Sequence, residues 1–239
     1  MAMYFLNILI TPILFLNYLI LFNLSKKKVL NNINYSLFLM AVFDKIAWLY
    51  DPLVRLSSRS RRCAEKIKFV AKLKKSDVVL DIGGGTGLIA SFISDYVKGI
   101  IVLDPSKKMM AKSKSDKIEK VYGTVQGMKF KDSTFDVVYC VDSFHHFTNG
   151  HKKKDFDNVL HDSIKEMLRV LKKNGVLVII DFDTGKFRGK MMDLFEKLFF
   201  RGGSKFNSRD ELSNLFDDFK VMVEFFDLDN SCYIAKISK

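Results

Sequence analysis

A run of glycines follows a carboxylate at the end of an apolar segment of the chain. Asp81 lies in the apolar segment Val78–Ile82, and the stretch Gly83–Gly87 contains four glycines. Glycine costs conformational entropy, so four of them close together indicate a ligand that must lie against the backbone. A carboxylate at this point repels a diphosphate and attracts an ammonium group. We therefore expect Asp81 and this glycine loop to bind a ligand that carries an ammonium group.

A second carboxylate ends the next apolar segment. Asp104 follows Ile100–Leu103, and an acid at this position of a nucleoside-binding sheet accepts hydrogen bonds from both ribose hydroxyls. A ligand with an amino acid at one end and a ribose at the other is S-adenosylmethionine (SAM). The competing interpretation is a dinucleotide, because Gly85–Ala90 also satisfies the pattern GxGxxA. That interpretation would make the protein an NAD(P)-dependent oxidoreductase.

Two histidines and an aspartate are the candidates for proton transfer. His145 and His146 follow the apolar segment Val137–Cys140, within the stretch VDSFHHFTN. Imidazole titrates near neutrality, so either ring could take a proton from an acceptor that arrives protonated, with Asp142 orienting the ring. The alternative is that one histidine packs under the loop and hydrogen-bonds to the backbone.

Neither the histidines nor the cysteines have the spacing of a metal site. The four histidines lack the HExxH pattern, and Cys63, Cys140 and Cys232 form no CxxC pair. We expect no metal site, no disulfide and a reducing compartment.

Short apolar runs alternate with helical segments in the part of the chain that carries these residues. The predicted strands are Val78–Ile82, Ile100–Leu103, Val137–Cys140 and Val176–Ile180. The predicted helices are Leu88–Val97, Lys107–Ser113 and Asp157–Leu171, with the sequence KKNG capping the last of them. This alternation is typical of a parallel sheet with helices on both faces, whose ligands bind outside the carboxyl ends of the strands. Near the C-terminus, FKVMVEFF and SCYIAKI are separated only by DLDN, which predicts an antiparallel hairpin.

Four motifs of the chain resemble those of class I SAM-dependent methyltransferases, in their order and spacing. They are LDIGGGTG, IVLDPSKKMMAK, GTVQGMKFKDSTFDVVYCVDSFHH and IKEMLRVLKKNGVLVIID. The likeness runs from about Phe43 to the C-terminus and is greatest to the methyltransferase type 11 branch, which includes the ubiquinone and menaquinone biosynthesis methyltransferases. It implies an α/β fold, with a Rossmann-like seven-stranded sheet that is mostly parallel and has an antiparallel last strand. It also implies SAM as the cofactor, bound by Asp81, Gly83, Gly85 and Gly87, with the ribose on Asp104.

The chain departs from this family at the adenine site. Thr124 stands where the family commonly has a carboxylate. We expect backbone groups and apolar contact with Met109 or Val125 to hold the adenine, and SAM to bind more weakly. The pair Tyr50-Asp51 is similar to the family's N-terminal lid, so Tyr50 is expected to cover the cofactor or line the acceptor pocket. The alternative for Tyr50 is one more aromatic residue on a packed helix.

The first 24 residues contain no charge and are followed by SKKK. A helix of this length, at about 1.5 Å per residue, would span the roughly 30 Å core of a bilayer. The cationic flank favours attachment to the cytoplasmic face of the membrane, and a helix buried in the protein or lying on the membrane surface is the alternative. We divide the chain into a hydrophobic segment at 1–28, an N-terminal helical lid at 29–75 and a SAM-binding domain at 76–239. In the second segment Arg55, Arg59, Arg61 and Arg62 form a basic patch, which we expect to be a solvated helix face.

The net charge of +12 is compatible with nucleic acid, an anionic membrane or no partner at all. Base methyltransferases carry a [DN]PP[YF] tetrad where this chain has Val141-Asp142-Ser143-Phe144, which disfavours a nucleic-acid substrate. The insertion GKFRGKMMDLFEKLFFRGG predicts a basic amphipathic helix that either covers the pocket or lies on anionic lipid. These features favour a small, lipophilic acceptor such as a quinone precursor or a lipid. The alternative is a catalytically silent SAM-binding domain that recruits a partner to the membrane.

Overall fold

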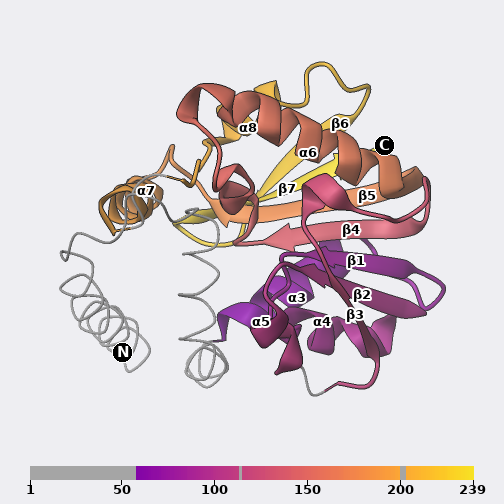
Figure 1. The fold of residues 1–239 in the computed structure, drawn as a ribbon. Helices are drawn as coiled ribbons and strands as arrows, with labels where there is room; N and C mark the ends of the chain where they lie inside the picture. The colour runs from indigo at the N-terminus through magenta and orange to yellow at the C-terminus, as the bar shows by residue number, and fades with distance from the viewer. Residues whose placement is uncertain (1–57, 113–114, 200–202) are drawn as a thin grey trace.

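The computed structural model describes residues 58–112, 115–199 and 203–239. Within them, seven strands form one sheet in the order β3-β2-β1-β4-β5-β7-β6 (Figure 1). The strands are β1 (Val78–Ile82), β2 (Gly99–Asp104), β3 (Ile118–Tyr122), β4 (Phe135–Val141), β5 (Leu171–Phe182), β6 (Met222–Asp227) and β7 (Cys232–Ser238). Strands β1 to β5 are parallel, whereas β7 pairs antiparallel with both β5 and β6. The predicted Rossmann-like sheet and its reversed terminal hairpin are therefore confirmed.

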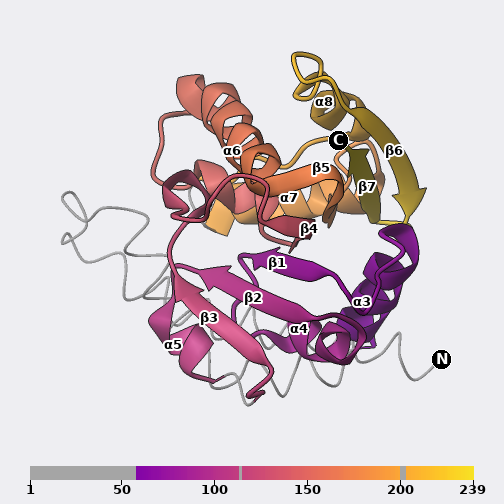
Figure 2. The same cartoon turned by 90° about the vertical axis from the view of Figure 1, so that its right-hand side faces the viewer.

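Helices cover both faces of the sheet. They are α3 (Arg59–Val70), α4 (Leu88–Ile93), α5 (Lys107–Ala111), α6 (Phe156–Val170), α7 (Phe187–Phe199) and α8 (Arg209–Asn214), with the short 3₁₀ turns η1 (Ser94–Tyr96), η2 (Val125–Gly127), η3 (Phe144–Thr148) and η4 (Lys153–Asp155). Helices α6 and α8 pack on one side of the sheet, and α3 and α4 pack on the other (Figure 2). Because the central strands are buried on both sides, they read as continuous apolar runs.

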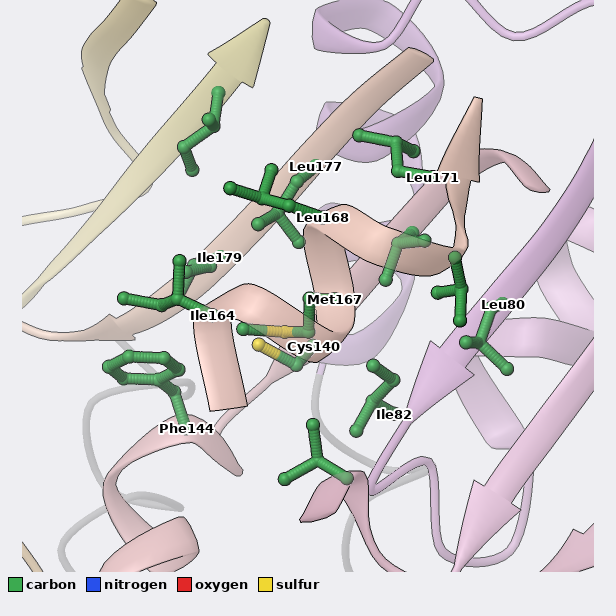
Figure 3. Close-up of a cluster of buried hydrophobic side chains, with 14 of the residues drawn as sticks. Leu80, Ile82, Cys140, Phe144, Ile164, Met167, Leu168, Leu171, Leu177 and Ile179 are labelled. Carbon is green, nitrogen blue, oxygen red and sulfur yellow. The ribbon is translucent and has the colours of Figure 1, made fainter. Parts of the chain in front are cut away.

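The core on the α6 side fixes the middle of the sheet. Ile164 and Met167 of α6 pack beside Cys140 of β4 and Ile179 of β5 (Figure 3), and all four side chains are fully buried. These two helix residues lie three positions apart, so they share the apolar face of α6. The packing holds β4 and β5 in one rigid layer.

The end of α6 differs from the expectation. The helix ends at Val170, and Leu171 already pairs with Phe135 of β4. Asn174 is left-handed, with a φ of 66°, but it lies inside β5, where the pairing jumps to Val137 and Val176. The prediction that KKNG caps the helix is therefore wrong, because the left-handed residue forms a bulge in the strand instead.

Residues 1–57 lie outside the described residues. The predicted membrane anchor at 1–24, most of the helical lid at 29–75 and Tyr50 fall in this range, so the three-part division of the chain stays a prediction. Helix α3 is the described part of the lid segment. In the described part of the chain, no helix is both long enough and apolar enough to cross a bilayer.

Candidate active site

The loops that follow β1, β2, β3 and β4 line a cavity of about 630 Å³. Of the residues predicted to bind a cofactor, the cavity wall includes Asp81, Gly83, Gly85, Asp104, Met109, Thr124 and Val125. Gly87 is not part of the wall. It forms the N-cap of α4 instead. Of the residues predicted to move a proton, Asp142 and His146 line the cavity, whereas His145 lies behind it, with 3% of its surface exposed.

The glycine loop turns tightly around the end of β1. Gly83 and Gly85 have φ values of 72° and 56°, which L-residues with side chains rarely adopt. Gly84 matters for a different reason, which the sequence analysis missed. A Cβ on Gly84 would lie 2.4 Å from Oδ2 of Asp81, so this glycine leaves room for the carboxylate.

The carboxyl group of Asp81 is buried and faces no compensating positive charge within its immediate contacts. The Tyr139 hydroxyl donates to its Oδ2 over 2.9 Å, and Tyr139 is itself fully buried. Burial raises the pKa of Asp81 to about 7, with a further rise from the negative charge of Asp104 and an opposing effect of the Tyr139 hydrogen bond. A cationic ligand would stabilise the ionised form of this group.

The second carboxylate holds two loops together. Asp104 accepts hydrogen bonds from the amides of Gly85 and Ser106, each over 2.8 Å. At a dinucleotide site, amides of the glycine loop bind the diphosphate. Here the Gly85 amide already donates to a carboxylate, and a second carboxylate, that of Asp81, stands on the other side of the loop. The cavity therefore fits a ligand with positive charge and hydroxyl groups better than it fits a diphosphate.

The start of α3 is bound to the carboxyl end of β4 by an ion pair. Nη2 of Arg59 donates to Oδ1 of Asp142 over 2.9 Å, and Nη1 donates to Oδ2. The expectation that Arg59 belongs to a solvated face is therefore wrong, although Arg61 and Arg62 are exposed. The expectation that Asp142 orients a histidine is also not met, because its oxygens are taken by a guanidinium 83 residues earlier in the chain.

The carboxylate that contacts a histidine is Asp181, at the end of β5. Nδ1 of His145 lies 2.8 Å from Oδ1 of Asp181, and the His145 amide donates to Oδ2 over 3.1 Å. Nε2 of His145 lies 3.1 Å from Nε2 of His146, whose Nδ1 lies 3.1 Å from Oγ of Ser204. Each ring nitrogen of both histidines therefore has a partner, so proton transfer from an acceptor would first require one of these contacts to break.

The two histidines titrate very differently. Burial lowers the pKa of His145, but the charges and hydrogen bonds of Asp181 and Glu196 more than offset it and raise the pKa to about 10. Burial and the neighbouring charge of His145 lower the pKa of His146 to about 3. His146 is accordingly neutral at pH 7 and a weak base.

Helix α7 brings a further carboxylate to these histidines. A Cβ on Gly189 would lie 1.9 Å from the carbonyl oxygen of Asp183, so this glycine lets α7 lie directly against the end of β5. Glu196 lies seven residues later, on the same face of the helix. Its Oε1 is 3.6 Å from Nε2 of His145. In Figure 1, α7 lies beyond the arrowheads of β4 and β5.

Comparison with known proteins adds a family to this geometry. Residues 80–179 match the family model described as "Methyltransferase domain". This range includes the glycine loop, both cavity carboxylates and the paired histidines. Residues 80–179 therefore match a methyltransferase domain, and the fold is that of class I SAM-dependent methyltransferases. The cofactor of this class is SAM, which supplies a methyl group on a positively charged sulfur when bound.

Individual relatives of this methyltransferase domain are distant. The chain is 31% identical over 118 residues to the uncharacterized methyltransferase YcgJ of Bacillus subtilis, an alignment that covers 46% of this chain and 43% of YcgJ. It is 31% identical over 156 residues to the ubiquinone/menaquinone biosynthesis C-methyltransferase UbiE of Xylella fastidiosa, covering 60% of this chain and 58% of UbiE. The crystal structure of YcgJ superposes with a TM-score of 0.60 over 74% of this chain and 97% of that chain, at 17% identity. The chain thus spans less than two thirds of both of these curated relatives.

The raised pKa of Asp81 predicts that SAM binds more tightly as the pH rises. Below pH 7 the ligand-free protein holds Asp81 largely protonated, and a neutral carboxyl group attracts an ammonium group weakly. We expect the affinity for SAM to rise about 30-fold between pH 5.5 and 8, as the ionised fraction grows. Titration calorimetry in two buffers of different ionisation enthalpy, at pH 6.5, should show proton release on binding.

The matched control for this pH dependence is Asp81→Asn, which cannot ionise at this position. Its SAM affinity is expected to be low and to vary little across the same pH range. A wild-type affinity that stays constant from pH 5.5 to 8 would contradict the assignment of Asp81 as the contact for the ammonium group.

Proposed function

We propose that this protein transfers a methyl group from SAM to a small, lipophilic acceptor, such as a quinone precursor or a lipid. The observation that carries the proposal is the cavity with Asp81 and Asp104 at two neighbouring strand ends and the glycine loop between them. In this proposal Asp81 binds the ammonium group and Asp104 binds the ribose hydroxyls. Met109 and Val125, both buried in the wall, pack against the adenine, and Thr124 lies beside them.

The wall beyond the cofactor residues supports a small acceptor. Arg59, Asp142, His146 and Phe147 line this part of the cavity. Methyl transfer is an in-line displacement, so much of the catalysis comes from holding the acceptor in position. In this proposal the ion pair of Arg59 and Asp142 holds the start of α3 over the β4 end, and η3 supplies His146 and Phe147 as a wall for the acceptor.

The lipophilic character of the acceptor is supported by α7. Phe187, Met191 and Leu194 are 78%, 52% and 50% exposed, and their spacing of four and three residues places them on one side of the helix. The cations Lys186, Arg188 and Lys190 flank this apolar side. Such a surface next to the cavity suits an acceptor that is delivered from an apolar phase. The name of the UbiE relative is compatible with a quinone-related acceptor.

The experiment is transfer of a radiolabelled methyl group from SAM to components of a membrane-lipid extract. We expect label in at least one extractable compound with the wild type, and a loss of roughly 100-fold or more in rate with Asp81→Ala. If SAM binds by calorimetry but no extracted compound gains label, the silent binding domain is favoured and the proposed transfer is wrong.

A further inference from the structure

Two histidines and a glutamate bring three donor atoms together beside the cavity. Nε2 of His145 lies 3.1 Å from Nε2 of His146 and 3.6 Å from Oε1 of Glu196. The donor atoms of the three residues all lie within 4.8 Å of one another. In a tetrahedral site with bonds of about 2.0–2.2 Å, the ligand atoms are roughly 3.3–3.6 Å apart. The two distances from Nε2 of His145 are therefore close to those between ligands around one ion.

Neighbouring groups orient the two imidazole rings. An ion at this site would displace the proton that the raised pKa of His145 keeps on Nε2 in the metal-free protein, and the ring would still donate its Nδ1 proton to Asp181, over 2.8 Å. This arrangement, in which a carboxylate holds the far nitrogen of the ring, is the usual support of a metal-bound histidine. The His145 ring is also stacked on Phe206, with the ring centroids 3.9 Å apart. Ser204 contacts Nδ1 of His146, which leaves its Nε2 directed at His145.

Glu196 provides an independent observation. Its Oε2 is buried and has no hydrogen-bond partner among the described residues. A buried carboxylate oxygen without a partner costs free energy. Moving α7 outward would expose this oxygen to solvent, but it would also break the close contact of Gly189 with Asp183. A cation bound between the carboxylate and the two rings would supply the missing partner.

We propose that His145, His146 and Glu196 bind a divalent transition-metal ion. Two imidazole nitrogens and one carboxylate match Zn²⁺ best, and three protein ligands leave a further coordination position open. The sequence spacing predicted no metal site, because Glu196 lies on another element far from the histidine pair. His146 is also part of the cavity wall, so the open position would be available to an oxygen of the acceptor. This role of the ion rests on the proposed function, whereas its binding does not.

The test uses the full chain after dialysis against a chelator. Co²⁺ and Zn²⁺ are titrated into it, with bound metal counted by mass spectrometry and the Co²⁺ site followed by its visible absorption. We expect one ion per chain, and a loss of affinity of roughly 100-fold in Glu196→Gln and in His146→Ala, since each removes a ligand. The control is His151→Ala, which removes another histidine of the cavity wall and should bind the ion like the wild type.

Circular dichroism and calorimetry with SAM establish that each variant is folded and keeps its cofactor site. The proposal is overturned if the wild type binds well under one ion per chain, or if both ligand variants bind it as tightly as the wild type. Because metal content is measured without any acceptor, these results are distinct from a failure of methyl transfer.

Discussion

Gly84→Ala is expected to weaken SAM binding by roughly 100-fold, which corresponds to about 2.7 kcal/mol. The added Cβ would lie 2.4 Å from Oδ2 and 2.5 Å from Cγ of Asp81, distances that a non-bonded carbon cannot tolerate. Asp81 is a short side chain whose carboxylate is packed against the hydroxyl of Tyr139. Either the carboxylate turns away from the cavity or the glycine loop retreats from it. Both outcomes remove the group that we assign to the ammonium end of SAM.

The cost to folding should be much smaller than the cost to binding. Overpacking at one buried position typically destabilises a protein by about 1–3 kcal/mol, and Gly84 does not need a left-handed backbone, because its φ is not among the positive values. Calorimetry with SAM and urea denaturation of the ligand-free protein would separate the two effects.

Gly99→Ala is the matched control for this substitution. Gly99 begins β2, and a Cβ there would meet nothing within 4 Å, so the variant should bind SAM like the wild type. If Gly84→Ala binds SAM within about threefold of the wild type, the position of the Asp81 carboxylate does not determine binding.

Local sequence patterns predicted the sheet and the cofactor end of the site because both depend on residues close together in the chain. Asp81 and the glycines are adjacent, and Asp104 ends the neighbouring strand, so parallel pairing of β1 with β2 is enough to bring them to one edge. Gly84 escaped notice because its role depends on where the Asp81 side chain turns, which no spacing rule encodes.

The contacts of the histidines and of Arg59 depend on tertiary packing between distant segments. Asp181 comes directly after the predicted strand Val176–Ile180 and matched no motif, and its pairing with His145 requires that β4 and β5 lie side by side. Glu196 lies on the side of the predicted insertion helix opposite Phe187, Met191 and Leu194, so the hydrophobic pattern gave no signal of a buried acid. That Glu196 reaches the histidines follows only from the contact of Gly189 with Asp183, which places α7 against the end of β5.

Loss of the ion pair of Arg59 and Asp142 should lower the free energy of unfolding, because this pair joins the start of α3 to the end of β4. Arg59 also donates to Sγ of Cys232 over 3.2 Å and stands over the ring of Phe182, 5.5 Å from its centroid. Removing one partner of a buried pair costs about 3–5 kcal/mol. The side chains of Arg59 and Asp142 are 25% and 34% exposed, so we expect a smaller loss, about 2 kcal/mol, for Arg59→Met.

A double-mutant cycle isolates the pair from the other contacts of Arg59. Asp142 has a φ of 51°, a left-handed value that Asn tolerates better than other replacements, so Asp142→Asn removes the charge with the least backbone strain. Urea denaturation of the wild type, both single variants and the double variant should give a coupling energy of about 1–2 kcal/mol.

The pair of Lys117 and Asp95, whose side chains are 67% and 66% exposed, is the control cycle and should give a much smaller coupling energy, because solvent screens an exposed pair. Burial raises the pKa of Asp142 and the charge of Arg59 opposes that rise, so without the guanidinium the carboxyl group should hold its proton to higher pH. The instability of Arg59→Met should then grow as the pH rises above the pKa of an unfolded aspartate, about 4, because the folded variant resists ionisation of Asp142 while the unfolded chain does not. A coupling energy near zero would mean that the pair does not hold α3 against the end of β4.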